Sequence, residues 1–113
     1  VARGLKVITG SDSAWGDYQL GNTVYETEWL VEAGYTSMQG VLSVTSEAAK
    51  ALGLDGIVGT LEAGKEADII IIDGDPSQDI NALWNVDEVF LAGGVVDRGS
   101  FDSTTTVRQQ PPS

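Results

Sequence analysis

Four consecutive isoleucines, Ile69 to Ile72, constrain the fold of this chain more than any other feature of its sequence. Their β-branched side chains favour an extended strand, which we place within residues 67–73. A strand with one face in water alternates apolar and polar residues, and this run does not alternate. We therefore expect both faces of the strand to be buried, which requires other elements of structure on each side of it.

The residues before this strand predict helices with well-marked ends. Apolar residues at helical spacing predict a first helix over residues 22–33, with its glutamates, Glu28 among them, facing away from the apolar stripe. Gly34 suits the left-handed position after the last turn, and Tyr35 can make the apolar contact that often accompanies such a cap.

A second helix is expected to begin at Thr36, because Thr36-Ser37-Met38-Gln39 matches a capping box. Its inward-facing residues would be Met38, Val41, Leu42 and Thr45. Gly40 lies inside this helix, where glycine costs about 1 kcal/mol relative to alanine, and close packing against another backbone would explain it. A third helix, over residues 46–52 with Thr45 as its N-cap, would end at Gly53.

Short β elements are expected at both ends of the chain. Residues 4–8 are largely apolar and predict a buried strand that leads into a polar loop. Near the C-terminus, a helical turn over residues 79–84 precedes a hairpin. The strands of that hairpin, 86–92 and 95–98, flank Gly93-Gly94, a favourable pair for a two-residue turn.

The chain contains no histidine and no cysteine. A zinc-type site draws chiefly on imidazole and thiolate ligands, and a Ser–His or Cys–His nucleophile needs histidine, so these residues alone cannot complete either site. The net charge of −11, with only six Lys and Arg residues, argues against binding to nucleic acid or to an anionic membrane. We expect a soluble chain in the cytoplasm, with an upstream signal peptide left open.

Asp73, Asp75 and Asp79 raise the question of a calcium loop. An EF-hand loop requires glycine at its sixth position and glutamate at its twelfth. Counted from Asp73, these positions hold Gln78 and Trp84, so the pattern does not match. We interpret the three acids as parts of a turn and of a helix cap.

Four segments occur in an order and spacing that are specific when taken together. They are Gly10-Ser11-Asp12-Ser13, the stretch from Leu30 to Met38, the stretch from Thr45 to Gly53, and the stretch from Gly59 to Ile69. In this arrangement the chain resembles the C-terminal part of the amidohydrolase superfamily, especially its imidazolonepropionase-like and dipeptidase-like branch. The resemblance covers roughly residues 4–98.

This resemblance implies an α/β fold that is part of a larger one. Residues 1–53 would form the last strand and the C-terminal helices of a (β/α)8 barrel, and residues 54–99 the C-terminal strands of a small β-sandwich. Residues 100–113 would be a loose tail. The rest of the barrel would then lie on residues outside this chain, with which this part would associate.

The resemblance also implies a reaction. The family's full-length enzymes use a divalent metal, zinc being our expectation, to activate water against C–N bonds of amides, cyclic amides or dipeptides. Asp12 matches the eighth-strand aspartate that binds the metal and relays a proton. Ser13, Trp15 and Tyr18 are candidate substrate contacts, although Ser13 could instead complete the loop and the two aromatic residues could cover the core. We expect the chain alone to bind no metal.

Two other functions are open. The chain could be a non-catalytic α/β domain that forms homo-oligomers through the strand Ile69–Ile72, because uncovered isoleucines favour association. Alternatively, Asp12 and Asp17 could act as an acid–base pair without a metal.

Overall fold

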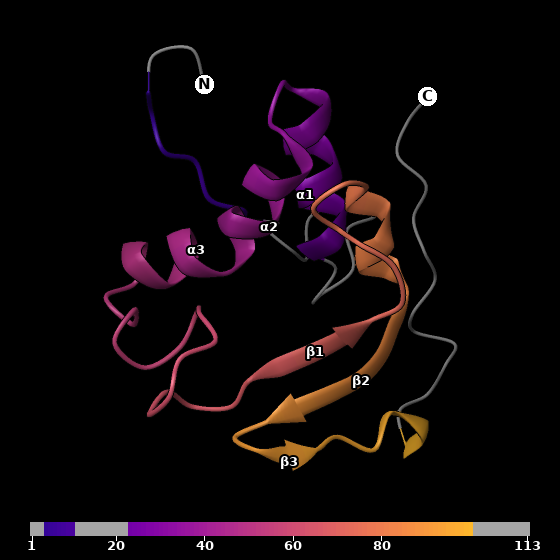
Figure 1. Ribbon diagram of the computed structural model, residues 1–113. Coiled ribbons are helices and arrows are strands. Elements are labelled where there is room, and N and C mark those ends of the chain that lie inside the picture. The colour runs from indigo at the N-terminus through magenta and orange to yellow at the C-terminus, as the bar shows by residue number, and fades with distance from the viewer. Residues whose placement is uncertain (1–3, 11–22, 101–113) are drawn as a thin grey trace.

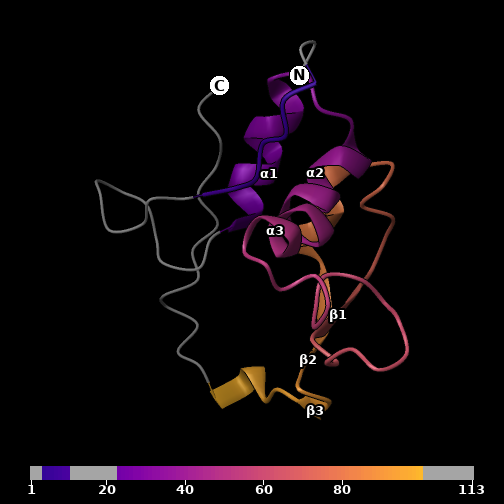
Figure 2. The same cartoon turned by 90° about the vertical axis from the view of Figure 1, so that its left-hand side faces the viewer.

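The computed structural model describes residues 4–10 and 23–100 (Figure 1). The elements in chain order are α1 (Thr23–Glu32), α2 (Ser37–Val44), α3 (Ser46–Ala51), β1 (Ile69–Ile72), η1 (Ile80–Trp84), β2 (Val86–Leu91), β3 (Gly94–Val95) and η2 (Arg98–Ser100). The α-helices gather at one end of the molecule and the three strands lie at the other (Figure 2). None of the helices in the described ranges has the length and apolar character that a membrane crossing requires.

The end of α1 is a Schellman motif, with Gly34 in the predicted left-handed position. Gly34 has a φ of +117°, which glycine adopts without the steric cost that a Cβ would add. The N–H of Gly34 donates to the carbonyl of Val31 at 3.0 Å, and the N–H of Tyr35 donates to the carbonyl of Leu30 at 2.9 Å. The direction in which the chain leaves α1 is therefore set by local hydrogen bonds.

The predicted capping box is present at the start of α2. The Thr36 side chain accepts from the Gln39 N–H at 3.1 Å, and the Gln39 side chain accepts from the Thr36 N–H at 2.9 Å. The predicted inward stripe of α2 is wrong, because Met38 and Leu42 are 49% and 37% exposed. The buried residues of α2 are Gly40 and Ser43, since small residues on this face let α2 approach its neighbours closely.

Gly40 explains that close approach. A Cβ built at this position would lie 3.0 Å from Cδ1 of Ile80 in η1 and 3.3 Å from Cγ2 of Val31 in α1. The expected close packing is therefore confirmed, although the neighbours are side chains rather than another backbone.

The core lies where α1, α2 and η1 meet, and α3 packs against α2 beside it. Its buried apolar residues are Tyr25, Ala49, Ile80, Ala82 and Leu83. Glu28 was expected to face away from the apolar stripe, and it is buried. The reason is a tertiary contact, because the indole N–H of Trp84 donates to the Glu28 carboxylate.

The third helix matches its prediction only in part. α3 ends as expected, with Gly53 at a φ of +71° and the Leu54 N–H donating to the Ala49 carbonyl at 2.8 Å. Thr45 occupies the N-cap position, but its hydroxyl donates to the carbonyl of Val41 at 2.8 Å instead of capping α3.

The strands form one antiparallel sheet in the order β1-β2-β3. Ile69 lies opposite Phe90 and Ile70 opposite Val89, with an irregularity between Ile71 and Ile72. The predicted hairpin is present. Its turn residues are Ala92 and Gly93, with φ of +50° and +82°, one position earlier than the predicted Gly93-Gly94.

The position of the turn is accompanied by hydrogen bonds from the two residues that immediately precede β1. The side chain of Asp68 accepts from the Ala92 N–H at 2.9 Å, and the carbonyl of Ala67 accepts from the Gly93 N–H at 3.0 Å. These two hydrogen bonds hold Ala92 in a left-handed conformation that an L-residue otherwise avoids.

The expectation that both faces of β1 are buried is wrong for this chain. Ile70 is 50% exposed and Ile71 is 45% exposed. The sheet is a single layer that contacts the helices through η1, and no second sheet covers it within the described ranges. The isoleucine run is therefore a strand, as predicted, but an incompletely covered one.

The strand predicted over residues 4–8 is also absent. The segment 4–10 has no regular secondary structure. A strand needs a neighbouring strand to receive its N–H and C=O groups, and none lies beside this segment in the described part of the chain.

Candidate functional site

The predicted site residues Asp12, Ser13, Trp15 and Tyr18 lie outside the described residues, as does Asp17. What the structure describes is the segment 4–10 that precedes them and the surface that holds this segment. That surface is formed by α2, by α3 and by Tyr35, which lies in the link between α1 and α2.

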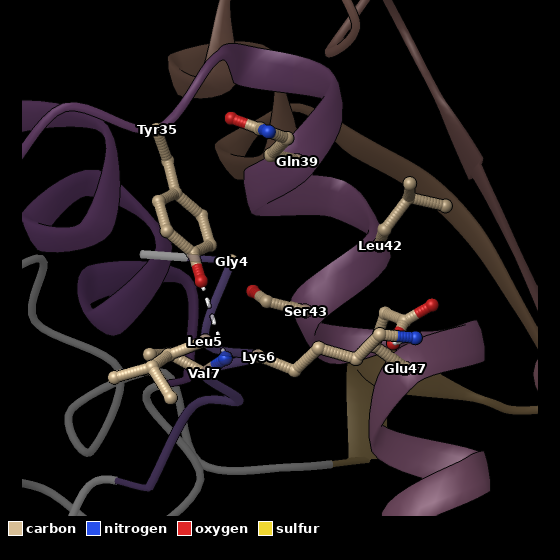
Figure 3. Close-up of a pocket in the computed structure, with 9 residues that line it drawn as sticks. All are labelled: Gly4, Leu5, Lys6, Val7, Tyr35, Gln39, Leu42, Ser43 and Glu47. Atoms are coloured by element: carbon tan, nitrogen blue, oxygen red, sulfur yellow. Dashed lines mark hydrogen bonds and ion pairs between the residues drawn. The ribbon is translucent and has the colours of Figure 1, made fainter. Parts of the chain in front are cut away.

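A shallow hollow separates the segment 4–10 from these helices (Figure 3). It is lined by Gly4, Leu5, Lys6, Val7, Tyr35, Gln39, Leu42, Ser43 and Glu47. Its volume is about 260 Å³. Two polar contacts cross this hollow and join the segment to the helices.

One anchor is a hydrogen bond to the backbone of the segment. The N–H of Val7 donates to the hydroxyl oxygen of Tyr35 at 3.2 Å (Figure 3). Tyr35 is the last residue of the Schellman motif of α1 and precedes the capping box of α2, so its backbone is held on both sides.

The second anchor is an ion pair on the neighbouring residue. The Lys6 ammonium lies 3.1 Å from the carboxylate of Glu47, which also pairs with Lys50 at 3.1 Å. The hydrogen bond from Lys50, and then the one from Lys6, hold the pKa of Glu47 below its ordinary value of 4.5. Glu47 therefore stays ionised, and able to hold Lys6, at neutral pH.

A second polar cluster surrounds Lys65. Its ammonium donates to the carbonyl of Asp55 at 2.6 Å and to the Thr60 hydroxyl at 2.6 Å, and it pairs with Glu62 at 2.7 Å. The same lysine, followed by the Thr60 hydroxyl, lowers the pKa of Glu62. The contacts join the two ends of the loop 55–65, so this cluster is structural. In the sequence, only the spacing of three residues between Glu62 and Lys65 could have indicated this cluster.

The acidic residues near β1 have local roles, as predicted. Asp75 accepts from the Ser77 N–H at 2.9 Å, and Asp79 caps η1 by accepting from the Asn81 N–H at 3.0 Å. Within residues 4–10 and 23–100, no group of three or more Asp, Glu, His or Cys side chains could hold a metal ion.

The sequence profile of the amidohydrolase family matches residues 1–96. This chain belongs to the amidohydrolase family. The predicted resemblance is thereby confirmed, and the amidohydrolase relatives imply a fold of the TIM-barrel type, of which the described residues form a small α/β part.

Relatives of this amidohydrolase chain include a deaminase, an imidazolonepropionase and a dipeptidase. It is 43% identical over 56 residues to the 5-methylthioadenosine/S-adenosylhomocysteine deaminase of Symbiobacterium thermophilum, covering 45% of this chain and 13% of the relative. It is 35% identical over 107 residues to the imidazolonepropionase of Thermoplasma volcanium, covering 89% of this chain and 25% of the relative.

The solved structure of a Xaa-Pro dipeptidase with bound methionine in its active site is also similar. It shares 35% identity and a TM-score of 0.76, and the match covers 84% of this chain and 23% of the dipeptidase. The chain thus spans a quarter or less of the length of these relatives.

Proposed function

We propose that this chain is the C-terminal part of a hydrolase that cleaves C–N bonds in small amides, cyclic amides or dipeptides. The family match carries this proposal, because it extends over residues 1–96 and so includes Asp12. A deaminase and a dipeptidase, two of the relatives, both act on C–N bonds by their names. Residues 1–53 would belong to the barrel and residues 54–99 to the β-sandwich.

The residues of this chain can hold a divalent metal only in part. The described residues contain no ligand cluster, and the whole chain has neither histidine nor cysteine. Asp12 would therefore contribute a single carboxylate, with the other ligands on residues beyond these 113. The ion, for which we propose zinc, would lower the pKa of water when bound.

Asp12 would act as a base and then as an acid. Its carboxylate would accept a proton from the attacking water and deliver it to the departing amine, a role that suits a carboxylate held beside both groups. Ser13, Trp15 and Tyr18 follow Asp12 closely in the chain and would contact the substrate. The two aromatic rings would supply an apolar wall.

The test uses the complete protein encoded around this segment. We expect its upstream sequence to contain a His-x-His pair and two further histidines. Release of amine or ammonia from a panel of dipeptides and cyclic amides would be measured for the wild type, Asp12→Asn and the exposed loop variant Asp55→Asn. Asp12→Asn should lower kcat at least about 100-fold and Asp55→Asn should not.

Unchanged turnover by Asp12→Asn would refute the assignment. A parallel variant, Asp17→Asn, examines the acid–base pair. Equal losses from Asp12→Asn and Asp17→Asn, in a protein whose turnover a chelator leaves intact, would favour that pair.

The exposed isoleucines support a second candidate function, association between copies of this chain. Ile70 and Ile71 lie on a sheet that other elements do not fully cover. The net charge of −11 opposes self-association, and salt screens this repulsion. Light scattering over a dilution series should then show larger species at 0.5 M salt than at 0.05 M. A monodisperse monomer at both salt concentrations would refute self-association.

A further inference from the structure

We propose that Asp55 is a site of isoaspartate formation and that the Lys65 ammonium suppresses this modification in the folded chain. The sequence has two Asp-Gly pairs, at 55–56 and 73–74. Such pairs are prone to the change, because glycine has no Cβ to hinder the approach of its own nitrogen. Asp55 and Gly56 are both exposed, and a Cβ built at Gly56 would meet no atom within 4 Å. The reacting groups are therefore not shielded by packing.

The modification needs no reagent other than water. The backbone nitrogen of Gly56 attacks Cγ of Asp55, a C–N bond forms, and one carboxyl oxygen leaves as water with the amide proton and the carboxyl proton. A water molecule then hydrolyses the cyclic imide. Cleavage at the side-chain carbonyl restores aspartate, and cleavage at the main-chain carbonyl gives isoaspartate. Nothing is oxidised or reduced.

Lys65 restrains the peptide group that has to react. Its Nζ donates to the carbonyl oxygen of Asp55 at 2.6 Å. That oxygen and the nitrogen of Gly56 belong to one planar peptide group, so a bond that holds the oxygen also restrains the nitrogen. The Lys65 side chain is only 15% exposed, and Thr60 at 2.6 Å and Glu62 at 2.7 Å hold its ammonium in place. The nitrogen is thereby hindered from turning toward Cγ.

Other contacts should keep the loop 55–65 in place when Lys65 is replaced. The Ile57 N–H donates to the Leu54 carbonyl at 2.9 Å, and the Glu66 N–H donates to the Ile57 carbonyl at 2.9 Å. Gly59 lies against α3, where a Cβ would be 2.6 Å from Cβ of Ala49. The loss of Lys65 should therefore free the Asp55 peptide by a local opening and leave the rest of the chain folded.

Isoaspartate at position 55 would change the loop permanently. The main chain would then run through the side-chain carbon of the residue, which adds one carbon to the backbone. The carbonyl that Lys65 binds would be displaced, and the bond at 2.6 Å could not form again in the same geometry. A transient opening of the loop would thus become a lasting one.

The experiment compares two sites within the same molecule. The 113-residue chain would be aged at neutral pH as the wild type, as Lys65→Met and as the matched control Lys50→Met. Peptide mapping by mass spectrometry locates isoaspartate, and an isoaspartate methyltransferase with labelled methyl donor quantifies it. We expect formation at Asp55 to be about tenfold faster in Lys65→Met, because a hydrogen bond from a charged group is lost, and unchanged in Lys50→Met. The rate at Asp73 should be the same in all three proteins.

A second variant identifies the chemistry. Asp55→Glu in the Lys65→Met background should abolish the product at position 55, since ring closure would then require a less favourable six-membered ring. Equal rates at Asp55 in Lys65→Met and the wild type would overturn the suppressing role of Lys65. An equal acceleration at Asp55 and Asp73 would also overturn it, because that result indicates general unfolding. Absence of isoaspartate at Asp55 in both proteins, while a free peptide of residues 52–60 reacts, would overturn the site.

Discussion

The indole N–H of Trp84 donates a hydrogen bond to the buried carboxylate of Glu28, and this contact joins α1 to η1 across 56 residues of sequence. Glu28 lies among core residues, where a carboxylate is costly unless hydrogen bonds satisfy it. The contact therefore specifies how the helices meet the segment that leads into the sheet.

Removal of this hydrogen bond should destabilise the chain. Trp84→Phe deletes the indole donor, and a buried acceptor left without its donor costs about 1–3 kcal/mol. The matched control is Trp29→Phe, because the buried Nε1 of Trp29 has no acceptor within the described residues. Urea denaturation should show that Trp84→Phe loses at least about 1 kcal/mol more than the control. Equal losses in both variants would contradict a role for the Glu28–Trp84 bond.

Substitution at Gly40 should depend on Ile80. Gly40→Ala gains about 1 kcal/mol in helix propensity, but its Cβ would lie 3.0 Å from Cδ1 of Ile80. We expect no gain in the wild type and a gain of less than about 1 kcal/mol in an Ile80→Val background, which lacks Cδ1 but keeps the Val31 Cγ2 contact at 3.3 Å. The free energies of unfolding of the four proteins in this cycle measure the coupling. Additive effects, within about 0.5 kcal/mol, would show that the two positions do not meet.

The hairpin turn should favour glycine at its first position. Ala92 has a φ of +50°, which costs an L-residue about 1–2 kcal/mol, so Ala92→Gly should stabilise the chain by up to about 1 kcal/mol. Ala51→Gly, in α3, is the control and should destabilise by about the same amount. Thermal unfolding would compare the two. The left-handed assignment fails if Ala92→Gly destabilises like its control.

Lys65 should hold the loop 55–65 in place. Lys65→Met removes the donor of two hydrogen bonds and one ion pair, and we expect a loss of about 1–2 kcal/mol together with faster proteolysis within the loop. Lys50→Met removes a lysine that pairs with Glu47 in α3, and should leave the rate of loop cleavage unchanged. Limited proteolysis followed by mass spectrometry locates the cuts. Wild-type cleavage of Lys65→Met would contradict this role.

Acid should weaken the turn at Asp75. The Ser77 hydroxyl, followed by the Ser77 N–H, holds the pKa of Asp75 below its ordinary value of 3.8. A carboxylate whose pKa is lowered by folding stabilises the fold above the unfolded pKa, and this stability is lost as the pH falls through the folded pKa. Asp75→Asn should therefore flatten the decline in stability below about pH 3.8. Urea titrations from pH 7 to pH 2 measure the free energy of unfolding at each pH. Asp73→Asn is the control for the loss of one charge. An unchanged decline in Asp75→Asn would argue against the Ser77 contacts.

Part of the candidate site could be predicted from the sequence, and part of it became known only from the structure. Asp12 was predicted because the order of four sequence segments resembles a known family, and its role stays a prediction, since the family match spans its position without testing it. Tyr35 and Glu47 carried no such signal. Val7 and Tyr35 are 28 residues apart, and no pattern in the sequence indicates that they meet.

Local chemistry determined the glycine ends of α1 and α3, the capping box of α2, the strand at Ile69–Ile72, the cap at Asp79 and the existence of the hairpin. These features depend on residues within about six positions of one another, so the sequence contains their cause. Only the tertiary structure decided that Gly40 and Ser43 form the buried face of α2, that Glu28 enters the core, and that Ile70 and Ile71 remain exposed. Burial depends on which distant segments come to lie against a residue, and hydrophobicity along the chain does not specify those segments.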